Sequence, residues 1–294
     1  VILAGTLVSF RIEDRVKEFY ILLMALVTGV FGVFAGRDIF FFYFEESAAA
    51  PLQFPDGVGL HNLREAYAAT IDTVAWVILL LMFELETWVL DDASFTPRVT
   101  FSLHALRALC YVAIVMAFFG YYEDMLTVSD TIVLAGVTDL CAMPPGDWSW
   151  AYTFGEYLPI TAANCATLSD AQAFVQFRGI QAVVDPTGLT EIIRLAWADV
   201  INAGTWILVV LILEIDVRLQ EHNRYEGLAL YASNALKFVL YSTLLVVAVY
   251  WGFKGDFVDF WDAFLWLVAF VFIEMNVFEW RAEEHAADSQ AEET

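Results

Sequence analysis

Long runs of apolar residues, separated by short polar segments, recur along the whole chain. Several runs reach the ~20 residues that an α-helix needs to cross a bilayer. The pattern therefore predicts an all-α integral membrane protein. Its six transmembrane helices are expected at residues 18–36, 67–90, 99–122, 193–217, 228–253 and 256–280.

The polar segments divide the chain into five parts. Residues 1–17 form an N-terminal segment, 18–122 carry helices one to three, and 193–280 carry helices four to six. Residues 123–192 form a long connection with a Pro-Pro-Gly sequence, which marks a loop, and we expect an extracytoplasmic loop subdomain there. The final part, 281–294, is acidic and rich in small residues, which is typical of a disordered tail.

A polar frame repeats inside three of the apolar runs. An Asp or Asn is followed four residues later by Trp, and the Trp eight residues later by Glu. A shift of 130 residues also aligns Arg107 with Lys237 on the helices that precede the second and third copies. Together these matches predict three related two-helix hairpins. The copies are Asp72, Trp76 and Glu84; Asn202, Trp206 and Glu214; and Asp262, Trp266 and Glu274.

The glutamates of this frame are expected to form an inner charged layer in the membrane. The first and last positions of each copy are ~18 Å apart along a helix, so they lie in opposite halves of the bilayer. An isolated charge at that depth is costly, whereas an ion pair costs less. We expect Glu84 and Glu214 to pair with Arg107 and Lys237 in some order, and Glu274 to reach a cation of the first or fifth helix. Because three acids face only two well-aligned cations, we expect one of the three glutamates to lack a full partner. Whether this layer fixes helix packing or lines a water-filled path stays open.

Three neighbouring polar residues are expected to face away from this layer. Glu86, Asp216 and Asn276 each follow a frame glutamate by two residues, about 200° round the helix. The sequence predicts that they cap their helices or contact water.

The other end of the frame predicts an outer polar layer. Asp72, Asn202 and Asp262 each stand one helical turn before a tryptophan, so carboxylate or amide and indole share a helix face. The indole N–H groups of Trp76, Trp206 and Trp266 have the reach to donate to these groups. Packing of the rings in the helix bundle is the alternative role.

Composition narrows the choice of partners. The chain is 60% hydrophobic, with mean hydropathy +0.64, and it carries 37 acidic against 14 basic residues. Nucleic acid and anionic lipid both require clustered Lys and Arg, so neither is an expected partner. Adaptation of the exposed segments to salty surroundings is a second explanation of the acidic excess.

Two observations orient the chain in the same way. Nine of the fourteen basic residues fall on or beside segments of one side, which by the positive-inside rule puts both termini in the cytoplasm of a multi-pass plasma-membrane protein. Cys141 and Cys165 then lie outside, where an oxidising compartment permits a disulfide between them, although two free thiols remain the alternative. Cys110 lies inside an apolar run, and we expect its side chain to pack as an ordinary apolar group.

Catalytic and metal-binding patterns do not emerge from the sequence. The four histidines are scattered, and no CxxC, Walker loop, GxSxG or HExxH occurs, so we expect neither an enzyme nor a metal or other cofactor. Intramembrane carboxylates favour a channel or transporter for protons or small cations. The alternative is a non-catalytic structural or assembly subunit of a larger membrane complex, and a homo-oligomer is also open.

Overall fold

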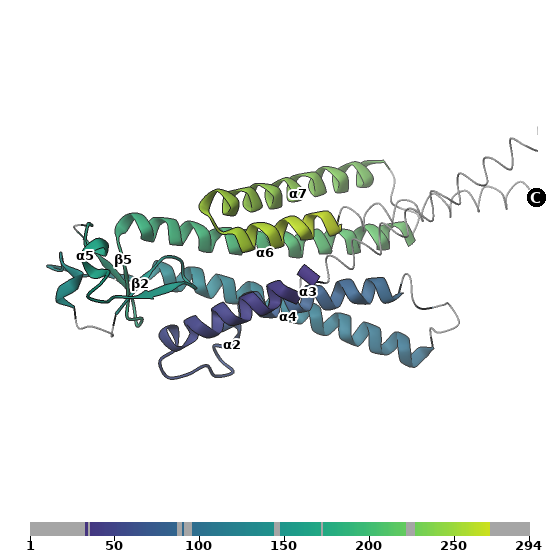
Figure 1. Cartoon of the computed structure of the whole chain (residues 1–294). Coiled ribbons are helices and arrows are strands. Elements are labelled where there is room, and N and C mark those ends of the chain that lie inside the picture. Colours follow the sequence, from purple (N-terminus) through teal and green to yellow (C-terminus); the bar gives the residue numbers. More distant parts are fainter. Residues whose placement is uncertain are drawn as a thin grey trace, which may run out of the picture.

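Long helices run side by side through most of the molecule, and a small sheet lies at one end of them, the sheet end (Figure 1). The structure is a computed structural model that describes residues 33–34, 36–86, 90, 96–143, 148–171, 173–221 and 227–270. Its helices span residues 36–53, α2 (Leu63–Ala66), α3 (Ala68–Glu84), α4 (Pro97–Ser129), α5 (Cys165–Leu168), α6 (Pro186–Glu221), α7 (Leu228–Lys254) and residues 257–270, with a 3₁₀ turn at Leu140–Ala142.

Local sequence signals set the ends of the longest helices. Pro97 opens α4 behind Thr96, whose hydroxyl accepts the Val99 N–H at 3.4 Å. Pro186 opens α6 behind Asp185, whose carboxylate accepts the N–H groups of the next turn. Both helices are longer than the apolar pattern predicts, α4 chiefly at its C-terminal end and α6 chiefly at its N-terminal end. Gly255 ends α7 with φ 88°, a left-handed conformation that glycine adopts without strain.

Three described helices are long and apolar enough to cross a membrane: α4, residues Pro186–Asp216 of α6, and α7. The apolar helix at Ala68–Phe83 is shorter. The expected first span at 18–36 lies almost wholly outside the described residues, and the expected sixth span is described only as far as residue 270. The membrane class is therefore supported, and the six-span arrangement remains a prediction.

The connection between α4 and α6 folds into a five-stranded sheet, so the expectation of an all-α fold is wrong. The strand order is β1-β4-β5-β2-β3, with β2 and β5 parallel and the other pairs antiparallel. Each strand has only three residues, which is too short for an alternating pattern to be recognised in the sequence. The strands are β1 (Thr131–Val133), β2 (Ser149–Ala151), β3 (Tyr157–Pro159), β4 (Val175–Phe177) and β5 (Ala182–Val184).

The predicted disulfide is confirmed within this sheet subdomain. Cys141 and Cys165 are bonded, with their Cα atoms 5.0 Å apart, and they join the 3₁₀ turn to α5. Cys110 is a buried free thiol in the helix bundle, as expected.

Two apolar cores position the candidate site. One lies among the helices and contains all three frame tryptophans. The other joins the sheet to the helices, where Phe177 and Val184 pack with Val128 of α4 and Ile192 of α6. Gly120 permits the close crossing of α4 over α2, because a Cβ there would lie 2.1 Å from the Arg64 carbonyl oxygen. The sheet is thus fixed directly above the space between the helices.

Candidate functional site

A cavity of about 180 Å³ lies between the sheet and the helices. It is enclosed by the helix over 36–53, by α2, α3, α4 and α6, by the turn after α7, and by residues 257–270. Neither Lys, Arg nor His lines it among the described residues, so we name it the acidic cavity. Its carboxyl groups belong to Glu45, Glu46, Glu65, Asp72, Asp124, Asp199, Asp256, Asp259 and Asp262.

The outer polar layer expected from the sequence falls in this cavity. Asp72 of α3, Asn202 of α6 and Asp262 of the last described helix all line its walls. Two further acids stand one turn before members of the frame, Asp199 before Asn202 and Asp259 before Asp262. A spacing of three residues keeps side chains on one helix face, which explains why these residues share the cavity.

Glu46 and Glu45 enter the cavity from the helix over 36–53, outside the three membrane-spanning candidates. Glu46 caps the start of α3 by accepting the Ala69 N–H at 2.7 Å and the Thr70 hydroxyl at 2.5 Å. Burial raises the pKa of Glu46 to about 7, although these hydrogen bonds act to lower it. Burial also raises the pKa of Glu45 to about 7, with further contributions from the nearby carboxylates of Glu156 and Asp256.

The turn between β2 and β3 covers the cavity on the sheet side. Thr153, Phe154 and Gly155 of this turn line the cavity. Gln53 holds the turn by donating to the Phe154 carbonyl at 2.7 Å and to the Tyr157 hydroxyl at 3.1 Å. The turn is therefore attached to the helix that carries Glu45 and Glu46.

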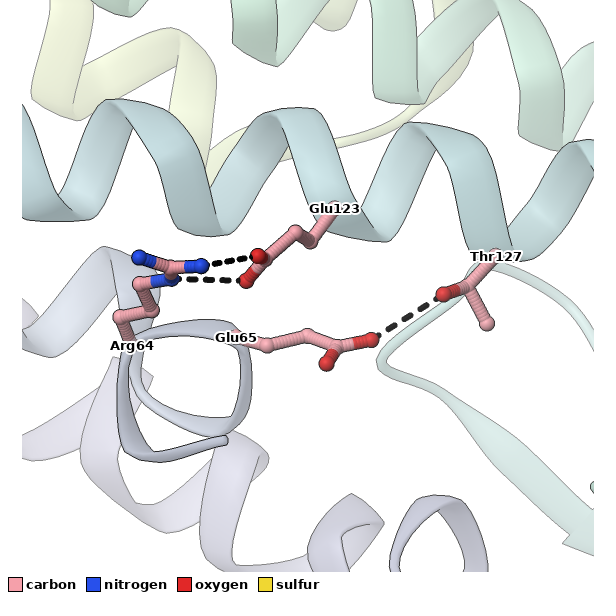
Figure 2. A network of polar contacts seen from close by, with 4 residues as sticks. All are labelled: Arg64, Glu65, Glu123 and Thr127. Carbon is pink, nitrogen blue, oxygen red and sulfur yellow. Dashed lines mark hydrogen bonds and ion pairs between the residues drawn. The ribbon is translucent and has the colours of Figure 1, made fainter. Parts of the chain in front are cut away.

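A polar clamp joins α2 to α4 at the edge of the cavity (Figure 2). Arg64 forms a two-pronged ion pair with Glu123, in which Nε lies 2.9 Å from Oε2. The next residue, Glu65, lines the cavity and accepts a hydrogen bond from the Thr127 hydroxyl at 3.0 Å. The arginine of this clamp thus forms its ion pair with Glu123, which does not line the cavity, and its charge also acts on the neighbouring Glu65.

Four aromatic rings pack together about one helical turn beyond the cavity-lining Asp72, Asn202 and Asp262. Trp76 lies between Trp206 and Trp266, with ring centroids 6.0 Å from each. Phe270 completes this tryptophan layer, 4.7 Å from Trp206 and 6.0 Å from Trp76. The three tryptophans are 5–7% exposed and belong to one apolar core. The frame tryptophans therefore come together as a packed layer directly below the acidic cavity.

Hydrogen bonds connect this layer to the cavity in two of its three copies. The Trp76 indole donates to Asp72 at 3.0 Å, and the Trp266 indole donates to Asp262 at 3.1 Å. The third copy differs, because Asn202 Oδ1 is buried and accepts no hydrogen bond from the described residues. Both roles considered for the tryptophans, packing and donation, thus occur together at Trp76 and Trp266.

Charge pairing beyond the tryptophan layer differs from the sequence prediction. Arg107 pairs with Glu86 at 2.7 Å, and Lys237 pairs with Asp216 at 3.1 Å, which we call the inner ion pairs. The prediction that Glu214 pairs with one of these cations is wrong, since Glu214 is exposed and bonds to Arg218 at 3.0 Å. The expectation that Asp216 meets water or caps its helix is wrong, since its side chain is only 3% exposed, whereas Glu86 is paired with Arg107 and still 26% exposed.

The geometry of the frame explains this correction. The positions eight and ten residues after each tryptophan lie about 80° to either side of it around the helix, so the tryptophan does not favour one over the other. The neighbouring helix decides, and α7 places Lys237 and Ser233 on the Asp216 side, where the Ser233 hydroxyl donates at 2.7 Å. The side chains of Glu84 and Glu274, and that of Asn276, lie outside the described part of the structure.

The described residues contain no preformed metal site. Within the described ranges, no three His, Cys, Asp or Glu side chains converge closely enough to hold a metal ion. The cavity acids are instead distributed over its walls, and their partners are neutral donors such as indoles, hydroxyls and backbone N–H groups. Such a set takes up protons, or attracts cations that keep their water.

Several cavity acids were missed by the sequence analysis. Asp199 and Asp259 had a signal, because each extends the frame by one turn toward the sheet. Asp124 had none, since only the folded structure brings the far end of α4 beside the frame helices.

A search for known relatives adds nothing to these observations, since no family model, curated protein or solved structure matches the chain.

Proposed function

We propose that the protein is a multi-pass membrane protein that conducts or transports protons or small cations, with the acidic cavity as its binding vestibule. The proposal rests on one observation: nine carboxyl groups line the cavity and no basic side chain among the described residues faces it. Carboxylates within membrane-spanning segments are costly and rare, and where they occur they commonly mark an ion or proton path. An acidic concave surface also concentrates cations from solution.

Protons are the favoured cargo within this class. Closely spaced carboxyl groups without cations repel one another when ionised, so they share protons and titrate as a set. A dehydrated divalent ion would instead require several oxygen ligands at ~2.0–2.6 Å from one point, and no described group of acids is arranged in this way. Monovalent cations that keep some of their water are compatible with a cavity of about 180 Å³.

The packing beyond the cavity is equally compatible with a second candidate, a non-catalytic subunit of a larger membrane complex. The tryptophan layer is densely packed, and the cations beyond it, Arg107 and Lys237, both have acidic partners. A closed state of a transporter and a purely structural core share these features. Transport measurements separate the two.

Orientation belongs to the same proposal. We place the sheet subdomain outside the cell and both termini in the cytoplasm of the plasma membrane, because basic residues concentrate on the opposite side and the subdomain holds a disulfide. The acidic cavity then faces the exterior. Labelling of a single cysteine introduced at Asp170 from outside intact cells is the matching test, with a cysteine at position 222 as the inside control.

The decisive experiment is flux through the purified protein in liposomes. A pH-sensitive dye trapped inside reports proton entry under an imposed membrane potential, and parallel samples measure sodium and potassium uptake. We expect proton flux in the wild type and a fall of about tenfold or more in the Asp199→Asn/Asp259→Asn variant, equivalent to at least ~1.4 kcal/mol on the transfer barrier.

Glu214→Gln is the matched control for this measurement. It also removes one acidic charge from α6, but at an exposed position bonded to Arg218 and far along the helix from Asp199. Its flux should equal that of the wild type. If the wild type carries no proton, sodium or potassium flux while remaining folded, the transport proposal is wrong and the subunit role is favoured.

A further inference from the structure

The hydrogen bonds between cavity carboxylates and the tryptophan layer carry a second inference. We propose that Asp72 and Asp262 are positioning residues that link the protonation of the acidic cavity to the packing of the tryptophan layer, through their bonds to Trp76 and Trp266. This inference deepens the proposed function, on which it rests, by assigning the mechanism that controls passage beyond the cavity.

The geometry supplies the link. Each carboxylate lines the cavity and also accepts an indole N–H, at 3.0 Å from Trp76 and at 3.1 Å from Trp266. Each of these indoles lies in the layer, with the two ring centroids 6.0 Å apart. A change at either carboxylate therefore acts on a ring of the layer through a single hydrogen bond.

Protonation changes the strength of that bond. An ionised carboxylate accepts a charge-assisted hydrogen bond, which is roughly twice as strong as a neutral one. A protonated carboxyl group has lost this charge, so it accepts the indole N–H more weakly, and its own O–H becomes a hydrogen-bond donor. The indole is then held less firmly, and the ring has freedom to leave its packed position.

The third copy of the frame lacks a titratable carboxylate bonded to its tryptophan. Asn202 does not titrate, and its buried Oδ1 accepts no hydrogen bond in the described part of the chain. Trp206 is held instead by its contacts with Trp76 and with Phe270, whose ring centroid lies 4.7 Å away. Two of the three tryptophans thus respond to protons, whereas Trp206 stays as the fixed member of the layer.

The surroundings of Asp72 and Asp262 determine how they titrate. The titratable groups that face them from the packed helices are Asp38, Glu46, Tyr121, Asp124, Asp199 and Asp259. All are acids, and no Lys or Arg of the described cavity lining is among them. Asp72 and Asp262 therefore exchange protons as members of a coupled set, with apparent values that belong to the set.

The test uses the full chain in lipid nanodiscs and follows the indole N–H hydrogen bonds by ultraviolet resonance Raman spectroscopy across a pH series. The chain has ten tryptophans, so difference spectra against Trp76→Phe and Trp266→Phe isolate the two relevant indoles. We expect both to report a weaker hydrogen bond at low pH. Asp72→Asn should remove the pH response of Trp76 alone, and Asp262→Asn that of Trp266 alone, because an amide keeps the acceptor but not the titration.

Asn202→Asp is the gain-of-function control. It places a titratable acceptor above Trp206, and the Trp206 signal should become pH-dependent. The inference is overturned if the Trp76 and Trp266 signals do not change with pH in the wild type, or if they change equally in the Asp72→Asn and Asp262→Asn variants. Should either of these variants fail to fold, the wild-type and Asn202→Asp spectra decide alone.

Flux measured on the same samples separates this inference from the proposed function. An indole response to pH without any ion flux would refute transport and leave the coupling intact. Ion flux with static indole signals would support transport and refute the coupling.

Discussion

The two halves of the helix bundle hold acidic side chains in opposite ways. On the sheet side of the tryptophan layer, nine carboxyl groups line a cavity, and their hydrogen-bond donors within the described ranges are neutral groups. On the other side, Glu86 and Asp216 each meet a cation, at 2.7 Å and 3.1 Å. Helix α6 supplies acids to both halves, and Glu86 lies two residues after the end of α3, which supplies Asp72 to the cavity.

This difference shows that an acidic side chain in the bundle does not by itself mark a functional site, because its partner decides what it does. Removing one partner from a buried ion pair leaves an uncompensated charge, so the pairs on the far side stabilise the arrangement of the helices. A carboxyl group without a cation is instead free to bind and release a proton. The candidate function therefore belongs to the unpaired half.

The largest expected effect concerns the Lys237–Asp216 pair, whose side chains are 8% and 3% exposed. Lys237→Met leaves Asp216 without this cation and should lower the free energy of unfolding by about 3–5 kcal/mol. Unfolding by sodium dodecyl sulfate in mixed micelles, followed by circular dichroism, measures this loss.

Two variants control for loss of charge and loss of side-chain packing. Arg218→Met breaks an exposed pair on the same end of α6 and should change stability by at most about 1 kcal/mol. Adding Asp216→Leu to Lys237→Met should recover most of the loss. A cost below about 1 kcal/mol for Lys237→Met would erase the contrast between the two halves.

A smaller effect of opposite sign is expected in the cavity. Asp124→Asn removes a carboxyl group that faces Glu65 and Asp199 in the cavity wall. Because no described cation is stranded by this change, the same unfolding assay should show unchanged stability or a gain of about 1 kcal/mol. A loss comparable to that of Lys237→Met would mean that Asp124 has a cationic partner.

A pH dependence of the free energy of unfolding is expected from Glu45 and Glu46. Their pKa values, raised to about 7 by burial, exceed the value of about 4.5 for an exposed glutamate, so the folded state binds more protons than the unfolded state in between. Stability is then highest below about pH 4.5 and falls as the pH rises to about 7. The melting temperature at about pH 5 should exceed that at about pH 8, and Glu45→Gln/Glu46→Gln should reduce this difference.

Asp170→Asn serves as the control for this comparison, because Asp170 is exposed in the sheet subdomain, away from the cavity. It should leave the difference between the two melting temperatures intact. A double variant with the full wild-type difference would show that other groups cause it.

The sequence predicted the features that depend on helix periodicity and charge. The repeated frame placed Asp72 and Asp262 in one cavity wall and gathered the three tryptophans into one core. The apolar lengths predicted the spans that α4, α6 and α7 supply. The disulfide followed from the position of Cys141 and Cys165 between two apolar runs.

Features that depend on contacts between distant segments were not accessible in this way. Three-residue strands carry no periodic signal, so the sheet was missed. The choice of Asp216 over Glu214 as the partner of Lys237 depends on which side of α6 faces α7. Glu45 and Glu46 reach the cavity only because Gln53 and the β2–β3 turn fix their helix beside α3.

The length of α4 has a mechanical consequence for the molecule. Its 33 residues extend ~50 Å, against ~30 Å for the apolar thickness of a bilayer, so α4 is long enough to project well beyond a bilayer that it crosses. The sheet subdomain is inserted between this projecting end and the start of α6, and Phe177 and Val184 pack on both helices. The sheet subdomain therefore holds the adjoining ends of α4 and α6 at a fixed separation. A relative tilt of α4 and α6 would then pivot at the sheet and be largest at their distant ends.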